Sequence, residues 1–208
     1  MLSTAHSWIY IHIPKTGGNS VQEALLPLSD DQKVLGGFRD GVDTFEIAGD
    51  VTPTKHATLS DNGRVLGDLS RYEIITSIRH PVERAVSYYF SDFRWKRQSN
   101  EGKWRTVTPH WSLDEFLALL PQIRPMTEYL KLDGNPYPRL RLLRFENLTA
   151  DFSELARSLN LPADTVLHHR NRTADRTGLR QLALSDAGVT AAVRTAHAQD
   201  FQAFGYAS

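Results

Sequence analysis

The sequence predicts an α/β fold in which helices flank a central, mainly parallel sheet. Short apolar runs rich in β-branched side chains are each followed by a segment with helical periodicity, and turns with glycine or proline separate them. No internal repeat or low-complexity tract interrupts this alternation. The 208 residues, 40% hydrophobic and 23% charged, suit one globular domain covering residues 1–208.

The first strand and helix lie near the N-terminus. Residues 8–13 are β-branched and aromatic, which predicts a buried strand, and Pro14 with the pair Gly17-Gly18 ends it in a tight loop. Apolar residues then recur at helical spacing over 21–28. The unit is therefore a strand, a glycine loop and a helix.

A second unit of the same kind follows residues 29–66, where only 44–47 resembles a strand. Residues 72–78 form an apolar run that reaches Arg79, and Pro81 suits the first position of a helix, which needs no N–H donor. An apolar stripe continues over residues 82–93. The remaining segments are predicted as a long loop (94–111), a helix (113–120), a strand (139–145), a helix (152–159) and a final helix (185–204).

The composition argues against several classes of protein. Lysine plus arginine and aspartate plus glutamate both number 24, so no overall charge favours a nucleic acid or an anionic membrane. The absence of cysteine excludes disulfides and thiolate metal ligands. The first apolar segment is too short for a signal peptide or membrane span, so we expect a soluble, cytoplasmic protein. The sequons at Asn147 and Asn171 are interpreted as chance matches.

The loop at residues 12–20, His-Ile-Pro-Lys-Thr-Gly-Gly-Asn-Ser, is the most informative segment. A glycine loop between a strand and a helix presents backbone N–H groups at the positive end of the helix dipole, and such sites bind phosphate. Lys15 adds a positive charge, and Thr16 and Ser20 add hydroxyl donors. The spacing of a nucleoside-triphosphate loop, GxxxxGK[ST], is missing. The alternative is a plain turn that carries a surface lysine.

Arg79 is the second candidate ligand of an anion. In an open α/β sheet, ligands bind beyond the carboxyl ends of the strands, and Arg79 and the glycine loop meet there if their strands are neighbours. Ser87, two turns into the following helix, would share the same anion. The alternative for Arg79 is an ion pair with a purely structural role.

The glycine loop and the segment Ile78-Arg79-His80-Pro81-Val82-Glu83-Arg84-Ala85-Val86-Ser87-Tyr88-Tyr89 together resemble sulfotransferases that depend on 3′-phosphoadenylyl sulfate (PAPS). The resemblance is strongest to the Golgi branch that contains the carbohydrate and heparan sulfate uronyl-type enzymes. It implies a P-loop-like three-layer sandwich, a single sulfotransferase domain over residues 1–208 and PAP as product. No cluster of carboxylates suggests a metal cage, and a sulfuryl group carries less charge than a phosphoryl group, so we expect no metal. Asn19 and His80 depart from the threonine and asparagine that are usual in that family.

The resemblance also implies a site. It places Lys15, Thr16, Gly17, Gly18, Asn19 and Ser20 at the 5′-phosphosulfate, Arg79 and Ser87 at the 3′-phosphate, and Arg172 and Thr173 in a loop that closes over the nucleotide. Residues 126–130, 143–148 and 200–206 are similar to other family segments. Packing alone would equally select the aromatic residues in these segments, among them Phe145.

Sulfuryl transfer to a hydroxyl needs neutralisation of the leaving oxygen and a base for the hydroxyl proton. We assign the first role to Lys15 and the second to His56. By the resemblance, His56 occupies the position of the histidine that the uronyl-type enzymes use as general base. Glu23 and Glu46 are alternative bases, and His12 is interpreted as a strand residue. The expected acceptor is a saccharide hydroxyl, with a small metabolite or a peptide tyrosine left open.

The loop at 94–111 holds five lysines and arginines and three tryptophans, a composition that suits a sugar ligand. Its alternative is a solvated loop whose tryptophans pack on the core. Two other functions stay open for the whole chain. One is a P-loop kinase or hydrolase, which the missing loop spacing disfavours, and the other is a PAP-binding module without catalysis.

Overall fold

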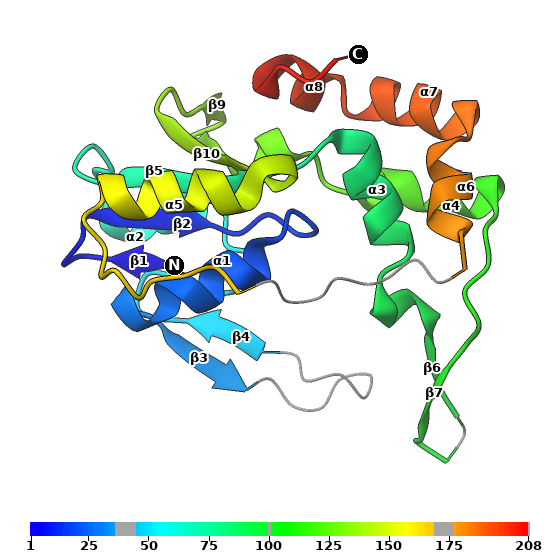
Figure 1. The fold of residues 1–208 in the computed structure, drawn as a ribbon, viewed down its shortest axis with the longest axis horizontal. Coiled ribbons are helices and arrows are strands. Elements are labelled where there is room, and N and C mark those ends of the chain that lie inside the picture. Colours follow the sequence, from blue (N-terminus) through cyan, green and yellow to red (C-terminus); the bar gives the residue numbers. More distant parts are fainter. Residues whose placement is uncertain (36–44, 100, 169–176, 208) are drawn as a thin grey trace. The chain divides into compact units, whose positions relative to one another are not determined.

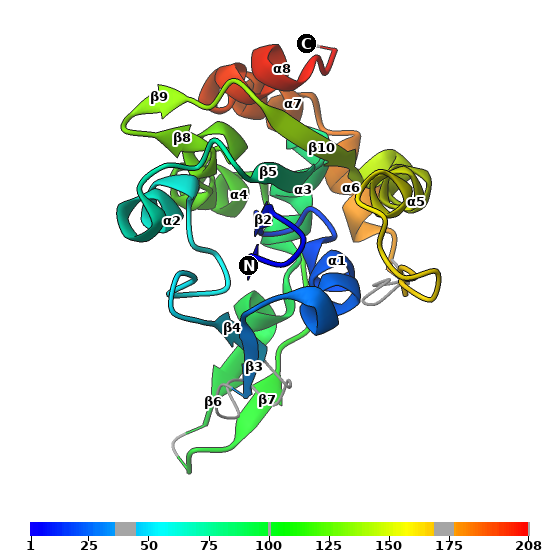
Figure 2. The same ribbon diagram turned by 90° about the vertical axis from the view of Figure 1, so that its left-hand side faces the viewer.

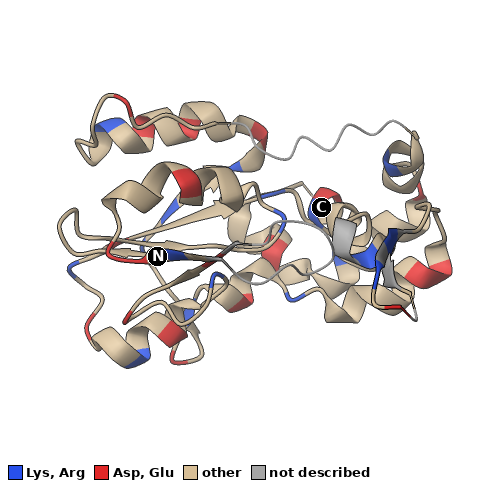
Figure 3. Cartoon of the chain, turned by 90° about the horizontal axis from the view of Figure 1, so that it is seen from below, with Lys and Arg blue, Asp and Glu red and all other residues tan. Residues whose placement is uncertain are grey.

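A computed structural model describes residues 1–35, 45–99, 101–168 and 177–207 (Figure 1). The chain forms two compact units. The first comprises the described residues within 1–35, 45–79 and 126–168, and the second those within 80–125 and 177–207. Basic and acidic residues are interspersed along the helices of both units (Figure 3), in line with the balanced composition.

The first unit is built on a four-stranded sheet in the order β1-β2-β5-β10. Strands β2 (Trp8–Ile11), β5 (Glu73–Ile78) and β10 (Leu140–Arg144) run parallel, and β1 (Leu2–Ser3) pairs antiparallel with β2. The prediction of an α/β fold with a central, mainly parallel sheet flanked by helices is confirmed. All four residues of β2 are buried, as expected for a strand covered on both faces.

Helices cover both faces of this sheet. Helix α1 (Gly18–Leu25) and helix α5 (Leu148–Ser158) pack on one face, and α2 (Leu59–Leu66) lies on the opposite side (Figure 2). The core between the sheet and the first two helices contains Trp8, Tyr10, Val21, Leu25, Ile75, Leu143, Phe152 and Leu155. Trp8 and Tyr10 are alternate residues of β2 and point to this face, and β5 and β10 contribute Ile75 and Leu143.

Short elements complete the first unit. Strands β3 (Gln32–Leu35) and β4 (Phe45–Ala48) form an antiparallel pair, as do β8 (Lys131–Leu132) and β9 (Asn135–Pro136). Three 3₁₀ turns occupy Leu26–Leu28, Met126–Tyr129 and Phe145–Asn147.

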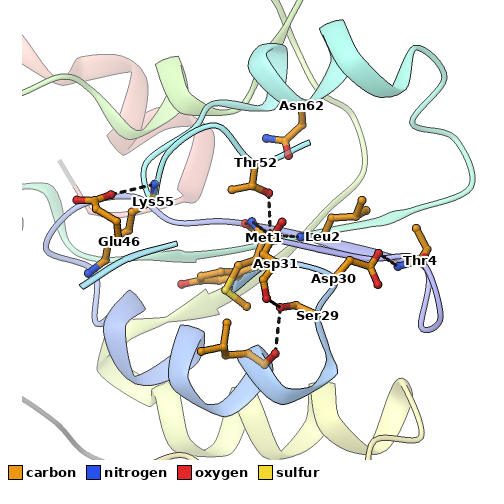
Figure 4. Close-up of polar contacts among 12 residues, drawn as sticks. Met1, Leu2, Thr4, Ser29, Asp30, Asp31, Glu46, Thr52, Lys55 and Asn62 are labelled. Atoms are coloured by element: carbon orange, nitrogen blue, oxygen red, sulfur yellow. Dashed lines mark hydrogen bonds and ion pairs between the residues drawn. The ribbon is translucent and has the colours of Figure 1, made fainter. Parts of the chain in front are cut away.

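A buried carboxylate fastens β1 to the rest of this unit (Figure 4). The side chain of Asp31 accepts hydrogen bonds from the backbone N–H of Leu2 and from the hydroxyl of Thr52, both at 2.8 Å. The neighbouring Asp30 is exposed and accepts one bond at 2.8 Å, from the backbone N–H of Thr4. Asp31 therefore connects segments that lie 29 and 21 residues away in the sequence.

The second unit is mainly helical, around a core that includes Tyr89, Phe116, Val189 and Val193. Its helices are α3 (Pro81–Tyr89), α4 (Leu113–Leu119), α6 (Leu179–Leu184), α7 (Ala187–Ala196) and α8 (Ala198–Phe204), with 3₁₀ turns at Asp92–Trp95 and Leu120–Gln122.

Two expectations for the second unit were incomplete. The predicted loop at 94–111 contains an antiparallel pair, β6 (Lys96–Gln98) and β7 (Trp104–Thr106). The single helix predicted over 185–204 is two helices, because His197 leaves the helical conformation with φ −119° and ψ 28°. A helical stripe continues across this break, which is why periodicity alone does not reveal it.

Candidate functional site

The predicted site residues of the first unit collect at the carboxyl edge of its sheet. Strands β2 and β5 are direct parallel neighbours, with Ile11 opposite Thr76, which confirms the arrangement expected for them. The glycine loop leaves β2 at this edge and Arg79 follows β5. Strand β10, the next neighbour of β5, ends there at Arg144 and leads into Phe145. Three strand ends thus contribute to one area.

The glycine loop has an unusual backbone. Lys15 has φ 69° and Gly17 has φ 83°, so two of its residues lie in the left-handed region. Gly17 is the N-cap of α1 and supplies no side-chain cap. The first turn of α1 therefore begins without a capping side chain, and the positive end of its dipole lies at the glycine loop, which favours an anion there. Lysine in this conformation is strained by about 1–3 kcal/mol, and such strain concentrates at functional sites.

Phe145 links the glycine loop to Arg79. The Arg79 guanidinium lies over the Phe145 ring, 4.0 Å from its centroid. A Cβ atom added to Gly17 would come within 2.9 Å of the same ring, so the loop packs directly against it. Phe145 as a whole is still 37% exposed. The two predicted anion ligands, the loop and Arg79, therefore share one aromatic contact.

His56 is held by the backbone of His12. Its Nδ1 lies 3.0 Å from the His12 carbonyl oxygen. A carbonyl oxygen only accepts, so Nδ1 carries the proton and the lone pair of the neutral ring lies on Nε2. The rings of the two histidines are 4.6 Å apart, and His56 is exposed whereas His12 is buried. This is the tautomer that a general base acting through Nε2 needs.

Burial lowers the pKa values of two groups near His56. Burial lowers the pKa of His12 well below its usual value near 6.5, and nearby His56 and Lys55 lower it further, so His12 is neutral. Burial also lowers the pKa of Lys55 to about 8, although the carboxylates of Glu46 and Glu23 oppose that shift. Glu46 accepts the backbone N–H of Lys55 at 3.4 Å (Figure 4). Both alternative bases therefore neighbour a cation.

Comparison with known proteins identifies a family. A family model described as the sulfotransferase family matches residues 1–207. The chain belongs to the sulfotransferase family. No curated protein and no solved structure matches it.

The predicted residues of this sulfotransferase fall into three groups. The first unit brings together the loop from Lys15 to Ser20, His56 through its bond to His12, and Arg79 through Phe145. Ser87 is buried on α3 of the second unit. Arg172 and Thr173 lie outside the described residues.

Two residues at this site of the sulfotransferase were given no role in it from the sequence. For Phe145, likeness to a family segment and packing were equal explanations, and His12 was interpreted as a strand residue. His12 follows β2 directly, its carbonyl holds His56, and a Cβ on Gly18 would lie 2.1 Å from its ring. The position of both residues directly after a strand is a signal that could have marked them.

Two tryptophans of the segment at 94–111 have structural contacts. Trp95 is buried and donates its indole N–H to the Tyr89 carbonyl at 3.2 Å, and Trp111 packs on the same core. Arg94 pairs with Glu115 at 2.7 Å. For these residues the packing interpretation of the segment holds.

Within the described part of this sulfotransferase, no helix is long and apolar enough to cross a membrane. The same residues contain no group of three or more metal-binding side chains.

Proposed function

We propose that this sulfotransferase transfers the sulfuryl group of PAPS to the hydroxyl of a saccharide. The observation that carries this proposal is the Phe145 ring, which touches both Gly17 and the Arg79 guanidinium. A bisphosphorylated adenosine carries anionic groups at two positions of one ribose. A site for it needs two separate groups that each bind one of these anionic groups and that lie close together. The glycine loop and Arg79 meet that requirement.

The residues present fit the charge of such a donor. PAPS carries about four negative charges, and burying them without partners would cost many kcal/mol. Lys15 and Arg79 supply cations, and the N-terminus of α1 supplies N–H donors for charge-assisted hydrogen bonds. We assign Lys15, Thr16, Gly17, Gly18, Asn19 and Ser20 to the 5′-phosphosulfate, Arg79 and Ser87 to the 3′-phosphate, and Arg172 and Thr173 to a loop over the nucleotide.

In the proposed reaction, His56 accepts the proton of the acceptor hydroxyl at Nε2. The hydroxyl oxygen forms a bond to sulfur as the bond from sulfur to the 5′-phosphate oxygen breaks, and PAP leaves. Lys15 neutralises the charge that develops on the leaving oxygen. General-base catalysis of this kind contributes about 10²- to 10⁴-fold in rate.

The similarity of the two motifs supports the carbohydrate and uronyl-type branch and its P-loop-like sandwich as finer proposals. The family match runs through the sequence of both units, which supports treating residues 1–208 as one sulfotransferase domain.

Binding of PAP in the presence of a chelator tests the donor site. We expect calorimetry to show binding to the wild type without magnesium, and the variants Lys15→Met and Arg79→Ala to bind about 10- to 100-fold more weakly, as for lost charged hydrogen bonds. Arg71→Ala is the matched control, because the Arg71 guanidinium also lies over an aromatic ring, that of Tyr72 at 4.8 Å, but at the start of β5. Wild-type binding of ATP and magnesium but not of PAP would favour a kinase instead.

Turnover with labelled PAPS and a panel of acceptors tests the chemistry. We expect transfer to saccharides, with transfer to small metabolites or peptide tyrosines as the competing outcomes. His56→Ala should spare PAP binding and reduce turnover about 10²- to 10⁴-fold. Unchanged turnover in this variant would remove His56 as the base and direct the test to Glu23 and Glu46. PAP binding without turnover on any acceptor would indicate a binding module.

A further inference from the structure

Three buried hydroxyl groups form a chain of hydrogen bonds beneath the glycine loop. The Tyr10 hydroxyl lies 2.7 Å from Ser77 Oγ, and Ser77 Oγ lies 2.8 Å from Thr16 Oγ1. Thr16 Oγ1 is in turn 2.8 Å from the carbonyl oxygen of Ile13. Tyr10, Thr16 and Ser77 have no exposed surface. We name these three residues the hydroxyl relay.

The carbonyl oxygen of Ile13, at the end of the hydroxyl relay, fixes which hydroxyl donates in each of its hydrogen bonds. A carbonyl oxygen cannot donate, so the Thr16 hydroxyl donates to Ile13, and this uses its one hydrogen. Ser77 must then donate to Thr16, and Tyr10 must donate to Ser77. Burial raises the pKa of Tyr10, so its hydroxyl keeps the hydrogen that the chain requires. The Thr16 hydroxyl, which the sequence predicted as a donor to an anion, thereby donates within the protein instead.

The hydroxyl relay joins the parts of the donor site. Tyr10 belongs to β2, Ser77 belongs to β5 two residues before Arg79, and Thr16 stands between the two loop residues with positive φ, Lys15 and Gly17. Strained backbone persists only where its surroundings hold it. The bond from Ser77 is a side-chain contact between the strained loop and the strand that carries Arg79.

We propose that Tyr10 and Ser77 are positioning residues for the sulfuryl donor. The hydroxyl relay holds the glycine loop in its anion-binding shape and at a fixed offset from Arg79. This inference rests on the proposed function, because the loop is taken as the 5′-phosphosulfate site. A purely structural role would lower stability without a specific loss of donor affinity.

Two substitutions remove one link each. Tyr10→Phe keeps the ring and deletes only the hydroxyl, and Ser77→Ala deletes the central link. In each variant we expect PAP to bind about tenfold more weakly in calorimetry, well below the unfolding temperature. In the protein without ligand, amide hydrogen exchange over residues 15–18 should be faster than in the wild type.

Matched controls separate positioning from stability. Tyr72→Phe also deletes the hydroxyl of a buried tyrosine; this hydroxyl accepts from Arg71 at 2.7 Å, before β5 begins. Thr76→Val deletes a buried hydroxyl that donates to the Ile11 carbonyl at 2.8 Å, one residue from Ser77. We expect both controls to lose stability but to keep the PAP affinity and the loop exchange of the wild type.

The outcomes are distinguishable. Wild-type affinity and wild-type loop exchange in Tyr10→Phe and Ser77→Ala would overturn the inference while leaving the proposed function intact. Failure of the wild type to bind PAP would instead overturn the proposed function, and loop exchange in the same variants would still decide whether the relay holds the loop. If Ser77→Ala does not fold, Tyr10→Phe carries the test, because it keeps the ring that packs in the core.

Discussion

The protonation of the His12 imidazole is tied to folding. It is 4% exposed, and its pKa is far below that of a histidine in an unfolded chain, first because of burial and then because of His56 and Lys55. A group that stays neutral when folded but takes a proton when unfolded favours the unfolded state in acid.

We therefore expect the free energy of unfolding to fall as the pH is lowered from about 7 to 5. Below about pH 6.5 the unfolded chain binds one more proton at this site, so stability changes by up to about 1.4 kcal/mol per pH unit. Urea denaturation at pH 7, 6 and 5 measures this slope, and His12→Gln should reduce it. His6→Gln is the control, since His6 is only partly buried. An equal slope in His12→Gln and the wild type would refute the assignment.

At the scale of elements, the end of β2 and the start of α1 are packed without space between them. A Cβ at Gly18 would lie 2.1 Å from His12 Cδ2 and 2.9 Å from the Tyr10 hydroxyl. Glycine at this position is required by close approach, because the φ of Gly18 is not positive.

Gly18→Ala should destabilise the protein by about 2 kcal/mol, as for other overpacked sites. His12→Ala removes the clashing ring, so the double variant should be more stable than the sum of the two single effects predicts. Urea denaturation of the four proteins gives the coupling. Strict additivity would mean that the two residues do not meet.

Asp31 is a second feature at this scale, since it joins β1 to segments distant in sequence. Asp31→Ala leaves the Leu2 N–H and the Thr52 hydroxyl without their acceptor, and each such buried donor costs about 1–3 kcal/mol. We expect a loss of about 2–4 kcal/mol in thermal or urea unfolding. Asp30→Ala, which removes an exposed acceptor, should cost less than about 1 kcal/mol. Similar losses in the two variants would contradict this account.

At the scale of the whole molecule, charge balance sets the colloidal behaviour. The formal net charge is zero at pH 7, and molecules without net charge associate most readily. We expect the second virial coefficient from light scattering to be lowest near pH 7 and to rise at pH 8.5. A minimum well away from neutrality would show that a local charge pattern dominates.

The sequence predicted those parts of the whole fold that have a local signal. Strand β2 is a continuous apolar run, and β5 and β10 are rich in isoleucine or leucine. Helices α1, α3, α4 and α5 have apolar stripes, so pattern alone locates these elements. Helix α2 was not predicted, because its segment contains Asn62 and Gly63, which are weak helix formers. Its start depends on a capping box between Thr58 and Asp61.

The candidate site divides in the same way. The glycine loop and Arg79 were predicted because each directly follows a strand. The contact of Phe145 with Arg79 and the bond of Ser77 to Thr16 join residues far apart in the sequence, the latter pair by 61 positions. Only the order of the strands brings such pairs together, and periodicity carries no information about that order.

The backbone conformation of Lys15 implies a trade-off between stability and activity. With φ 69°, this position would suit glycine better than lysine, by about 1 kcal/mol. Replacing the lysine with glycine would therefore give a more stable protein. That protein would lack the cation that we propose neutralises the leaving oxygen. A laboratory selection for thermal stability alone would favour that substitution. Any attempt to stabilise this enzyme should therefore screen for turnover at every round.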